Sequence, residues 1–258
     1  MHGYQAGKDS RESERMKIVI NPTYVGLREW IAQLPENFAT QGEVIYDARN
    51  QIRLMQAPDG TRMCVKRFHK PRLLNQYFYR FRKSKAHRAY ENGLYMLAHE
   101  VNTPGPVAYI EEYLFGGLAY SYLVTRMSEL RHLHREFTLD YRPELDKTIR
   151  PLARFVAHMH NEGINHLDFS PGNILWDLVD GEYRFEVVDN NRMTFGSVSL
   201  KEGCCSIRRI CARRSFFDTF AEEYAKARGM DEAQCRYWIH YYRDRFWQNG
   251  RKANYQYD

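Results

Sequence analysis

The clearest chemical signal in the sequence is a loop motif of the form H-x-D-x-x-x-x-N, made by His166, Asp168 and Asn173. A further acid, Asp189, follows two valines at the end of an apolar stretch. Phosphoryl transfer asks a protein for a carboxylate that orients the attacking hydroxyl and for oxygen ligands that hold magnesium on the phosphates. Asp168 fits the first role, and Asn173 and Asp189 fit the second. Each residue alone is most often a turn or cap residue, but the ordered set predicts phosphoryl transfer.

A lysine far upstream fits the same chemistry. Lys66 lies in residues 62–68 (RMCVKRF), a predicted strand, and a lysine there would contact the α- and β-phosphates of ATP. Such a lysine needs a carboxylate to hold it, and Glu91, in the next predicted helix, is the first choice, with Glu100 second. A lone lysine is more often a surface residue. Its position on a strand before a helix, ahead of Asp168, favours the nucleotide site.

The first half of the chain is predicted to form strands around one helix. Residues 43–56 (EVIYDARNQIRLMQ) and 62–68 are expected to pair as a β-hairpin, because an APDG turn signal lies between them. Residues 84–99 have apolar residues at helical spacing. Two further strands are predicted at residues 107–111 and 119–127, joined by a glycine turn.

The second half is predicted to be mostly helical. Residues 145–162 carry apolar residues at helical intervals and end before Gly163, which suits a helix C-cap. The H-x-D-x-x-x-x-N motif then lies in a loop with apolar flanks. A strand at 183–189 and helices at 208–224 and 232–247 complete the prediction. The predicted division is a leader or disordered segment at 1–15, a β-rich nucleotide-binding lobe at 16–127 and a helical catalytic lobe at 128–258.

Composition sets wider bounds on the class of protein. The 258 residues are 43% hydrophobic, which suits a globular fold with a real core. No apolar stretch approaches the ~20 residues of a membrane span, and the first 15 residues lack the apolar region of a signal peptide. Five cysteines, with no CxxC spacing, argue against a zinc site or a disulfide framework. We therefore expect a cytoplasmic protein.

The net charge of +6 is concentrated in two places. Residues 66–88 hold nine Lys or Arg, two His and no acid, interleaved with aromatic residues. A second basic cluster comprises Arg208, Arg209, Arg213 and Arg214. This pattern predicts an anionic partner, which could be nucleic acid, a phosphorylated sugar or an anionic membrane face. A solvated helix face is the alternative interpretation of residues 66–88.

The order of strand lysine, helix acid, motif loop and Asp189 resembles the protein-kinase-like superfamily. Within it, the chain looks like the lipopolysaccharide kinases, which phosphorylate Kdo or heptose of the inner core. Four stretches carry this closer likeness: residues 48–50 (ARN) in the first hairpin strand, 84–89 (SKAHRA), 102–106 (NTPGP) and 188–193 (VDNNRM). The resemblance covers roughly residues 40–200.

The resemblance implies an α+β, two-lobed protein-kinase-like fold with a β-rich N-lobe and a helical C-lobe. It implies ATP and Mg²⁺ as cofactors and a lipid-linked or phosphorylated sugar as the acceptor. The enzyme would be cytoplasmic, and residues 66–88 would make peripheral contact with the anionic inner-membrane surface. No nucleic acid partner is expected. His166 would hold the catalytic loop through backbone hydrogen bonds rather than react.

The sequence departs from the superfamily pattern in ways that bear on the substrate. There is no glycine-rich G-x-G-x-x-G loop, and residues 46–50 (YDARN) occupy its place. Either Arg49 and backbone amides, with Asn50 beside them, cover the nucleotide phosphates, or nucleotide binding is weak. Ser170 replaces the lysine usual in serine/threonine protein kinases. Only 69 residues follow Asp189, with no Ala-Pro-Glu segment. Because little chain is left to dock a peptide, a protein substrate is disfavoured.

Two alternative functions stay open at this point. A protein or small-metabolite kinase, such as an antibiotic phosphotransferase, would be expected to offer an acidic pocket, whereas this chain is basic. A pseudokinase that binds nucleotide or anionic lipid is suggested by the missing glycine-rich loop. The presence of Lys66, Asp168, Asn173 and Asp189 counts against it.

Overall fold

The computed structural model describes residues 15–79, 81–133, 143–210 and 214–248. The chain forms two compact units, the first from Met1–Tyr90 and Pro106–Arg126, the second from Glu91–Gly105 and Met127–Asp258. Residues 91–105, which the sequence-based division put in the N-terminal lobe, thus group with the second unit. Of the helices in the described part of the chain, none has the length and apolar composition to cross a bilayer.

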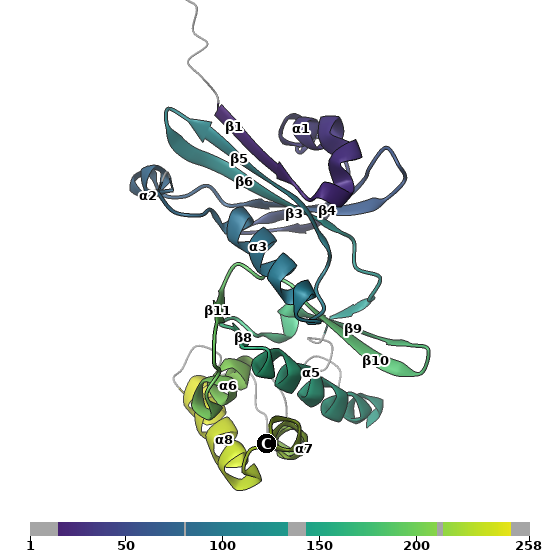
Figure 1. The fold of residues 1–258 in the computed structure, drawn as a ribbon, viewed down its shortest axis with the longest axis vertical. Helices are drawn as coiled ribbons and strands as arrows, with labels where there is room; N and C mark the ends of the chain where they lie inside the picture. The colour runs from purple at the N-terminus through teal and green to yellow at the C-terminus, as the bar shows by residue number, and fades with distance from the viewer. Residues whose placement is uncertain (1–14, 80, 134–142, 211–213, 249–258) are drawn as a thin grey trace, which may run out of the picture. The chain divides into compact units, whose positions relative to one another are not determined.

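The first unit is built on a six-stranded antiparallel sheet (Figure 1). The strand order is β1-β5-β6-β4-β3-β2. The strands are β1 (Arg15–Ile20), β2 (Glu43–Asp47), β3 (Gln51–Gln56), β4 (Arg62–Phe68), β5 (Pro106–Leu114) and β6 (Gly117–Arg126). The short 3-10 helix η1 (Pro22–Leu27) and three helices, α1 (Arg28–Asn37), α2 (Leu73–Phe78) and α3 (Lys85–Ala98), complete the described elements, α3 running on into the second unit.

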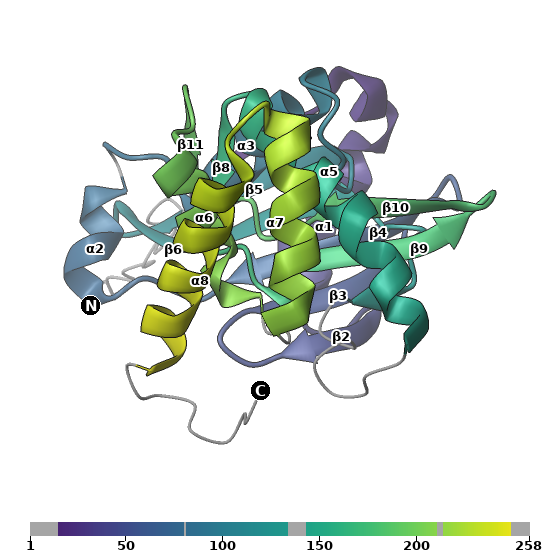
Figure 2. The same cartoon turned by 90° about the horizontal axis from the view of Figure 1, so that it is seen from below.

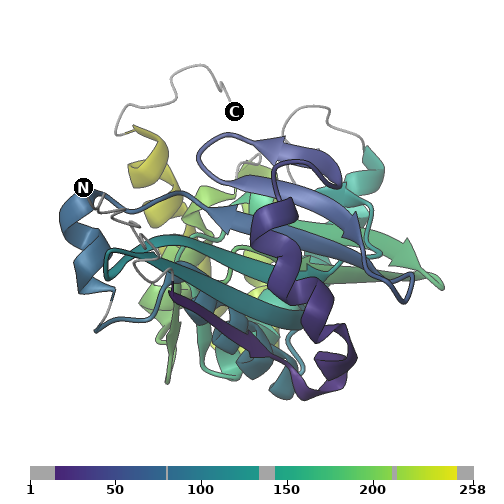
Figure 3. The same ribbon diagram turned by 90° about the horizontal axis from the view of Figure 1, so that it is seen from above.

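Helix α1 covers one face of this sheet (Figure 3). Its Ile31 and Leu34 are buried against the sheet core, which includes Val65 of β4 and Val124 of β6. Val65 and Val124 are paired in register across the two strands. Because side chains alternate along a strand, the neighbouring Lys66 projects to the opposite face. Burial of one sheet face by α1 therefore leaves the other face for the lysine.

Residues 43–56, predicted as one strand, form two. A turn at residues 48–50 separates β2 from β3, closed by a hydrogen bond from the Ala48 N–H to the Asn50 carbonyl. The side chain of Gln51 also donates to Asp47 across the turn. The interpretation of residues 48–50 as strand was therefore wrong. The prediction of a single helix in this half also missed α1 and α2.

The second unit is mainly helical (Figure 2). Its helices are α5 (Ile149–Asn161), α6 (Leu200–Ser206), α7 (Arg214–Arg228) and α8 (Glu232–Gln248), with short 3-10 turns η2 (Pro143–Thr148), η3 (Pro171–Asn173) and η4 (Ile207–Arg209). Its strands are β7 (His132–Leu133), β8 (Ile164–His166), β9 (Ile174–Val179), β10 (Glu182–Val187) and β11 (Met193–Phe195). In these strands β9 pairs with β10 and with β7, and β8 pairs with β11.

Helices α5 and α7 pack together around a buried aromatic core. Phe217, Phe220 and Tyr224 of α7 are fully buried and cluster with residues of α5 such as Val156. His160, at the end of α5, shares a hydrogen bond of 2.8 Å with the Tyr224 hydroxyl. This packing fixes the end of α5, from which the chain enters β8 and the motif loop.

Several elements in this half differ from the prediction. Residues 164–176, expected as a loop, contain β8, η3 and the start of β9. Helix α6 was not predicted, although Ser199 and Glu202 form a capping box at its start. The helix expected from residue 208 begins at Arg214, because residues 207–209 form the separate turn η4.

The turn between α5 and β8 provides a stability test. Gly163 has φ +69°, and a Cβ there would lie 2.7 Å from the Gly196 carbonyl oxygen. Gly181 has φ +82° but open space around it. A left-handed φ costs alanine about 1 kcal/mol, so Gly181→Ala should lower the free energy of unfolding by that amount. Gly163→Ala adds the clash of the new Cβ with the Gly196 carbonyl oxygen and should lower the free energy of unfolding by about 1–2 kcal/mol more. Each kcal/mol should lower Tm by roughly 2–4 °C.

Chemical denaturation of both variants beside the parent protein checks this difference. Equal losses for the two substitutions would contradict the close approach of the turn at Gly163 to the turn after β11.

Candidate active site

The imidazole of His166 ties together two parts of the predicted catalytic centre. The ring is fully buried, and its Nδ1 accepts a hydrogen bond of 3.1 Å from the Asp168 N–H. Its Nε2 lies 3.3 Å from the Val188 carbonyl oxygen. Because Nδ1 accepts, the ring proton sits on Nε2 and faces Val188. One neutral side chain thus links the loop of Asp168 to the strand end that precedes Asp189.

Asn173 closes this network from the other side. Its Nδ2 donates to the Asp168 carbonyl at 2.9 Å, and its own carbonyl accepts from the Val188 N–H at 2.9 Å. The register that pairs Ile174 with Val187 brings Asn173 and the end of β10 to the same end of the hairpin. Since Nδ2 is engaged, the side-chain oxygen of Asn173 is the atom left to act as a ligand.

Asp189 lies in a turn that several side chains hold in place. Its backbone has φ +63°, a left-handed conformation that aspartate tolerates better than most residues. The Asn191 side chain donates to Asp189 Oδ1 at 2.5 Å. Buried Asn190 donates to the Thr103 hydroxyl at 2.7 Å, and Thr103 donates to the Val187 carbonyl at 2.7 Å. The turn is therefore anchored to residues 102–106, one of the stretches that carried the family resemblance.

The carboxylate of Asp168 lies between two guanidinium groups. Arg209 Nη1 donates to Oδ1 at 2.6 Å, and Arg192 Nη1 lies 3.7 Å from Oδ2. Sequence reasoning gave neither arginine a role, although it noted Arg209 in a basic cluster and Arg192 within residues 188–193. Arg192 comes from the turn after Asp189 and Arg209 from the 3-10 turn η4, so only the folded chain shows their contact with Asp168.

The predicted nucleotide-binding residues of the first unit lie on its sheet. Lys66 is in register with Leu123 of β6, which is in turn in register with Tyr109 of β5. These three side chains share the face opposite α1. His87, near the start of α3, stacks on Tyr109 with ring centroids 4.5 Å apart. The face that bears Lys66 is thus the one against which the first turns of α3 pack.

The remaining predicted residues lie in α3, after it, or in the β2–β3 turn. Glu91 follows His87 by one helical turn and so lies on the same side of α3. Its pairing with Lys66 stays a prediction. Glu100 lies beyond the end of α3 with φ +57°. Arg49 is exposed in the β2–β3 turn, whereas the Asn50 side chain accepts a hydrogen bond from the His69 N–H at 3.1 Å.

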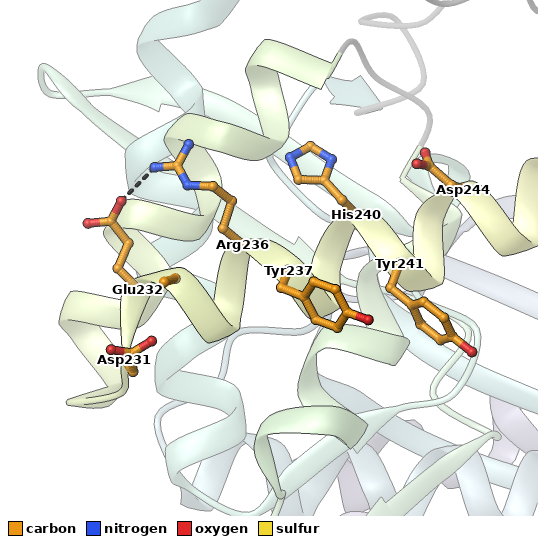
Figure 4. Close-up of a pocket in the computed structure, with 8 residues that line it drawn as sticks. Asp231, Glu232, Arg236, Tyr237, His240, Tyr241 and Asp244 are labelled. Atoms are coloured by element: carbon orange, nitrogen blue, oxygen red, sulfur yellow. Dashed lines mark hydrogen bonds and ion pairs between the residues drawn. The ribbon is translucent and has the colours of Figure 1, made fainter.

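A separate pocket of about 800 Å³ lies along α8 (Figure 4). Arg236 in its lining contacts Glu232, which also lines the pocket, at 2.5 Å, and Asp218, which does not, at 3.0 Å. None of the residues predicted for catalysis or nucleotide binding line it. The reactive groups of the motif therefore belong to a different place in the second unit.

Comparisons with known proteins bear on the family and the fold. The sequence model of the Lipopolysaccharide kinase (Kdo/WaaP) family matches residues 38–195. A solved structure of WaaP in complex with acyl carrier protein is similar, with a TM-score of 0.62 and 19% identity, over 90% of this chain and 99% of that one. The Rio2 kinase of Chaetomium thermophilum, an ADP/Mg²⁺-phosphoaspartate complex, aligns at a TM-score of 0.49 and 12% identity, over 88% and 78% of the two chains. A search of curated proteins by sequence found no match.

The sheet-based first unit, the helical second unit and the likeness to WaaP define a protein-kinase-like α+β fold, as the sequence predicted. The family match covers more than half of the chain, so the chain belongs to the lipopolysaccharide kinase (Kdo/WaaP) family. It is accordingly an ATP-dependent phosphotransferase.

Burial of His166 makes a prediction about pH. Burial lowers the pKa of His166 below its ordinary value of 6.5. As the pH falls through 6.5, this histidine becomes protonated in the unfolded chain but stays neutral in the folded chain. Its effect is therefore absent above pH 6.5, and the free energy of unfolding decreases as the pH drops below that value. This histidine alone contributes a slope of up to about 1.4 kcal/mol per pH unit. In His166→Asn the free energy of unfolding should fall less steeply between pH 6.5 and 5.

Denaturant titrations at several pH values measure both slopes. His160, whose pKa burial lowers to about 3, is present in both proteins and cancels in the comparison. Parallel curves for the parent and His166→Asn would contradict a neutral, buried His166.

Proposed function

We propose that this kinase transfers the γ-phosphoryl group of ATP to a sugar hydroxyl, on Kdo or heptose of the lipopolysaccharide inner core. Asp168 accepts the hydroxyl proton as the sugar oxygen bonds to the γ-phosphorus and the bond to the β-phosphate oxygen breaks, which releases ADP. His166 positions Asp168 through the backbone and does not react. Lys66, fixed by Glu91, holds the α- and β-phosphates, and Arg49 and the backbone near Asn50 cover them.

The donor atoms at the end of the β9–β10 hairpin suit a magnesium ion. Asn173 offers its side-chain oxygen and Asp189 its carboxylate, and hard oxygen ligands are what Mg²⁺ binds in proteins. Magnesium completes its coordination with waters and substrate phosphates rather than with an all-protein cage. When bound, it would neutralise charge on the β- and γ-phosphates. The role of the chain is to hold the two ligands at one strand end.

One observation supports a sugar rather than a peptide as the acceptor: few residues separate Asp189 from the next strand and helix. Met193 is already paired with His166 in the β8–β11 ladder, and α6 begins at Leu200. Between Asp189 and α6, the chain therefore forms no long loop that could bind a peptide. The guanidinium groups at Asp168 also disfavour a cationic antibiotic as acceptor, because like charges would meet there.

In this proposal the acceptor is linked to lipid. Helix α2 and the residues that follow it are suited to contact with a membrane surface. Leu73 is 76% exposed, Phe78 61% and Phe81 88%. Exposed basic residues surround them: Lys70, Arg72, Arg82 and Lys83. Apolar side chains that enter the headgroup region, with cations beside them, are how peripheral elements bind anionic bilayers. We propose that this surface rests on the inner-membrane face where the acceptor lies.

The function is tested by magnesium-dependent ATP consumption with and without a Kdo-containing lipid A precursor. Consumption should require the lipid, and Asp168→Ala should lose at least about 10²-fold in rate, as expected when a positioned base is removed. Asp180→Asn, on the exposed β9–β10 turn, is the matched control. Full phosphoryl transfer by Asp168→Ala to every acceptor tried would overturn the assignment of the base. ATP binding without acceptor-dependent loss would favour the pseudokinase instead.

The membrane surface is tested by co-sedimentation with vesicles of phosphatidylethanolamine and phosphatidylglycerol. The double change Phe78→Ser and Phe81→Ser should weaken binding at least tenfold, because two phenyl rings lose their burial in the bilayer. Leu178→Ser, which alters an exposed apolar residue of β9, should bind like the parent protein. Equal binding by the double variant, or equal binding to pure phosphatidylcholine, would argue against this surface.

A further inference from the structure

Arg209 makes the shortest contact to the Asp168 carboxylate among the described residues, yet it comes from a distant part of the sequence. It ends the 3-10 turn η4 and lies beyond residue 195, where the family match stops. Its Nη1 reaches Asp168 Oδ1 at 2.6 Å, and the side chain is 34% exposed. A contact of this length from a short, separate turn indicates that Arg209 belongs to the reaction centre.

The surroundings hold Arg209 firmly. Buried Ile207 and Ile210 fix the backbone on either side. The Phe246 ring of α8 lies 5.4 Å from the guanidinium carbon, within cation–π range. Arg208 faces the same ring at 5.8 Å, but its Nη1 bonds to the Cys205 carbonyl. Two adjacent arginines thus share one aromatic ring while only Arg209 reaches the catalytic carboxylate.

The guanidinium of Arg209 has donors to spare. An arginine carries five N–H donors in a planar fork that matches phosphate oxygens. Among the described residues, the structure gives Asp168 as the acceptor of one of them, at Nη1, and the side chain is 34% exposed, so an anion from solvent can reach the guanidinium group. A group fixed at a carboxylate, with unused donors, is suited to bind a second anion beside it.

The chemistry at Asp168 requires such a cation. In the transition state, negative charge spreads over the equatorial oxygens of the transferred phosphoryl group, and the Asp168 carboxylate next to them is repulsive. A preorganised cation there stabilises the developing charge. The position two residues after Asp168, where serine/threonine protein kinases usually have a lysine, is Ser170. The motif loop itself therefore lacks the charge.

We propose that Arg209 binds Asp168 and the transferred phosphoryl group at the same time. It thereby supplies, from η4, the positive charge that Ser170 does not carry. The proposal rests on the proposed function, because it assigns Arg209 to the same reaction. Arg192, at 3.7 Å from the other carboxylate oxygen, adds positive charge but no hydrogen bond of comparable length.

The first arm of the test is independent of any acceptor. Binding of inorganic phosphate, measured by ³¹P NMR titration without nucleotide, should weaken at least tenfold in Arg209→Ala. It should stay near the parent value in Arg208→Ala, the matched control, which removes the neighbouring guanidinium from the same ring. Arg209→Lys, which keeps the charge, should retain binding within about threefold. Unchanged phosphate binding by Arg209→Ala would overturn the proposal even if the kinase assignment holds.

The second arm measures turnover with the lipid acceptor. Arg209→Ala should lower kcat by on the order of 10²-fold, the loss typical of one transition-state donor, with the acceptor KM unchanged. Added guanidinium ions should restore part of the rate. A raised acceptor KM at unchanged kcat would instead place Arg209 on an anionic group of the acceptor. A higher kcat in Arg209→Ala would mean that Arg209 inhibits the reaction by occupying the Asp168 carboxylate. Either result overturns the proposal.

Discussion

The buried imidazole of His166 is the constraint on which the catalytic half of the molecule depends. It is the shared partner of the Asp168 N–H and the Val188 carbonyl, so a single ring fixes the spacing between the loop of Asp168, the proposed base, and the strand end that precedes Asp189. Burying a polar ring is unfavourable unless both nitrogens find partners. Both nitrogens do, and the ring is neutral because Nδ1 accepts from the Asp168 N–H and so carries no proton. Loss of either partner would leave a buried polar atom unsatisfied.

Elements from all parts of the second unit position the residues around this ring. Helix α5, held by its packing on α7, delivers the chain to β8 through the left-handed Gly163. Asn173 and Val188 close the loop onto the β9–β10 hairpin. Residues from the N-terminal part of this unit, around Thr103, then hold the turn after Asp189. Phosphoryl transfer needs little covalent chemistry from the protein, so positioning of this kind, with two guanidinium groups beside Asp168, is what the second unit would contribute.

Sequence reasoning located most of the elements that carry the proposed site residues. The motif residues, the strand of Lys66 and the helix at 84–99 follow from short patterns, and these elements are present in the structure. The turn at 48–50 was taken for strand because residues 43–56 are β-rich at both ends and contain no glycine or proline to mark a turn between them. Helix α6 was missed because it is short, and Arg209 received no role because its meeting with Asp168 is a long-range contact. Residues 102–106 were recognised as typical of the family, but only the fold shows that they anchor the turn after Asp189.

The most direct test of the account is to follow the terminal phosphate of ATP to its product. Purified protein would be incubated with magnesium, γ-labelled ATP and Kdo-containing lipid A precursor, and the products separated and analysed by mass spectrometry and ³¹P NMR. The account predicts a new phosphomonoester on a sugar hydroxyl of the lipid, formed in step with ADP. Label found only on the protein or in free phosphate, with the lipid unmodified, would contradict it.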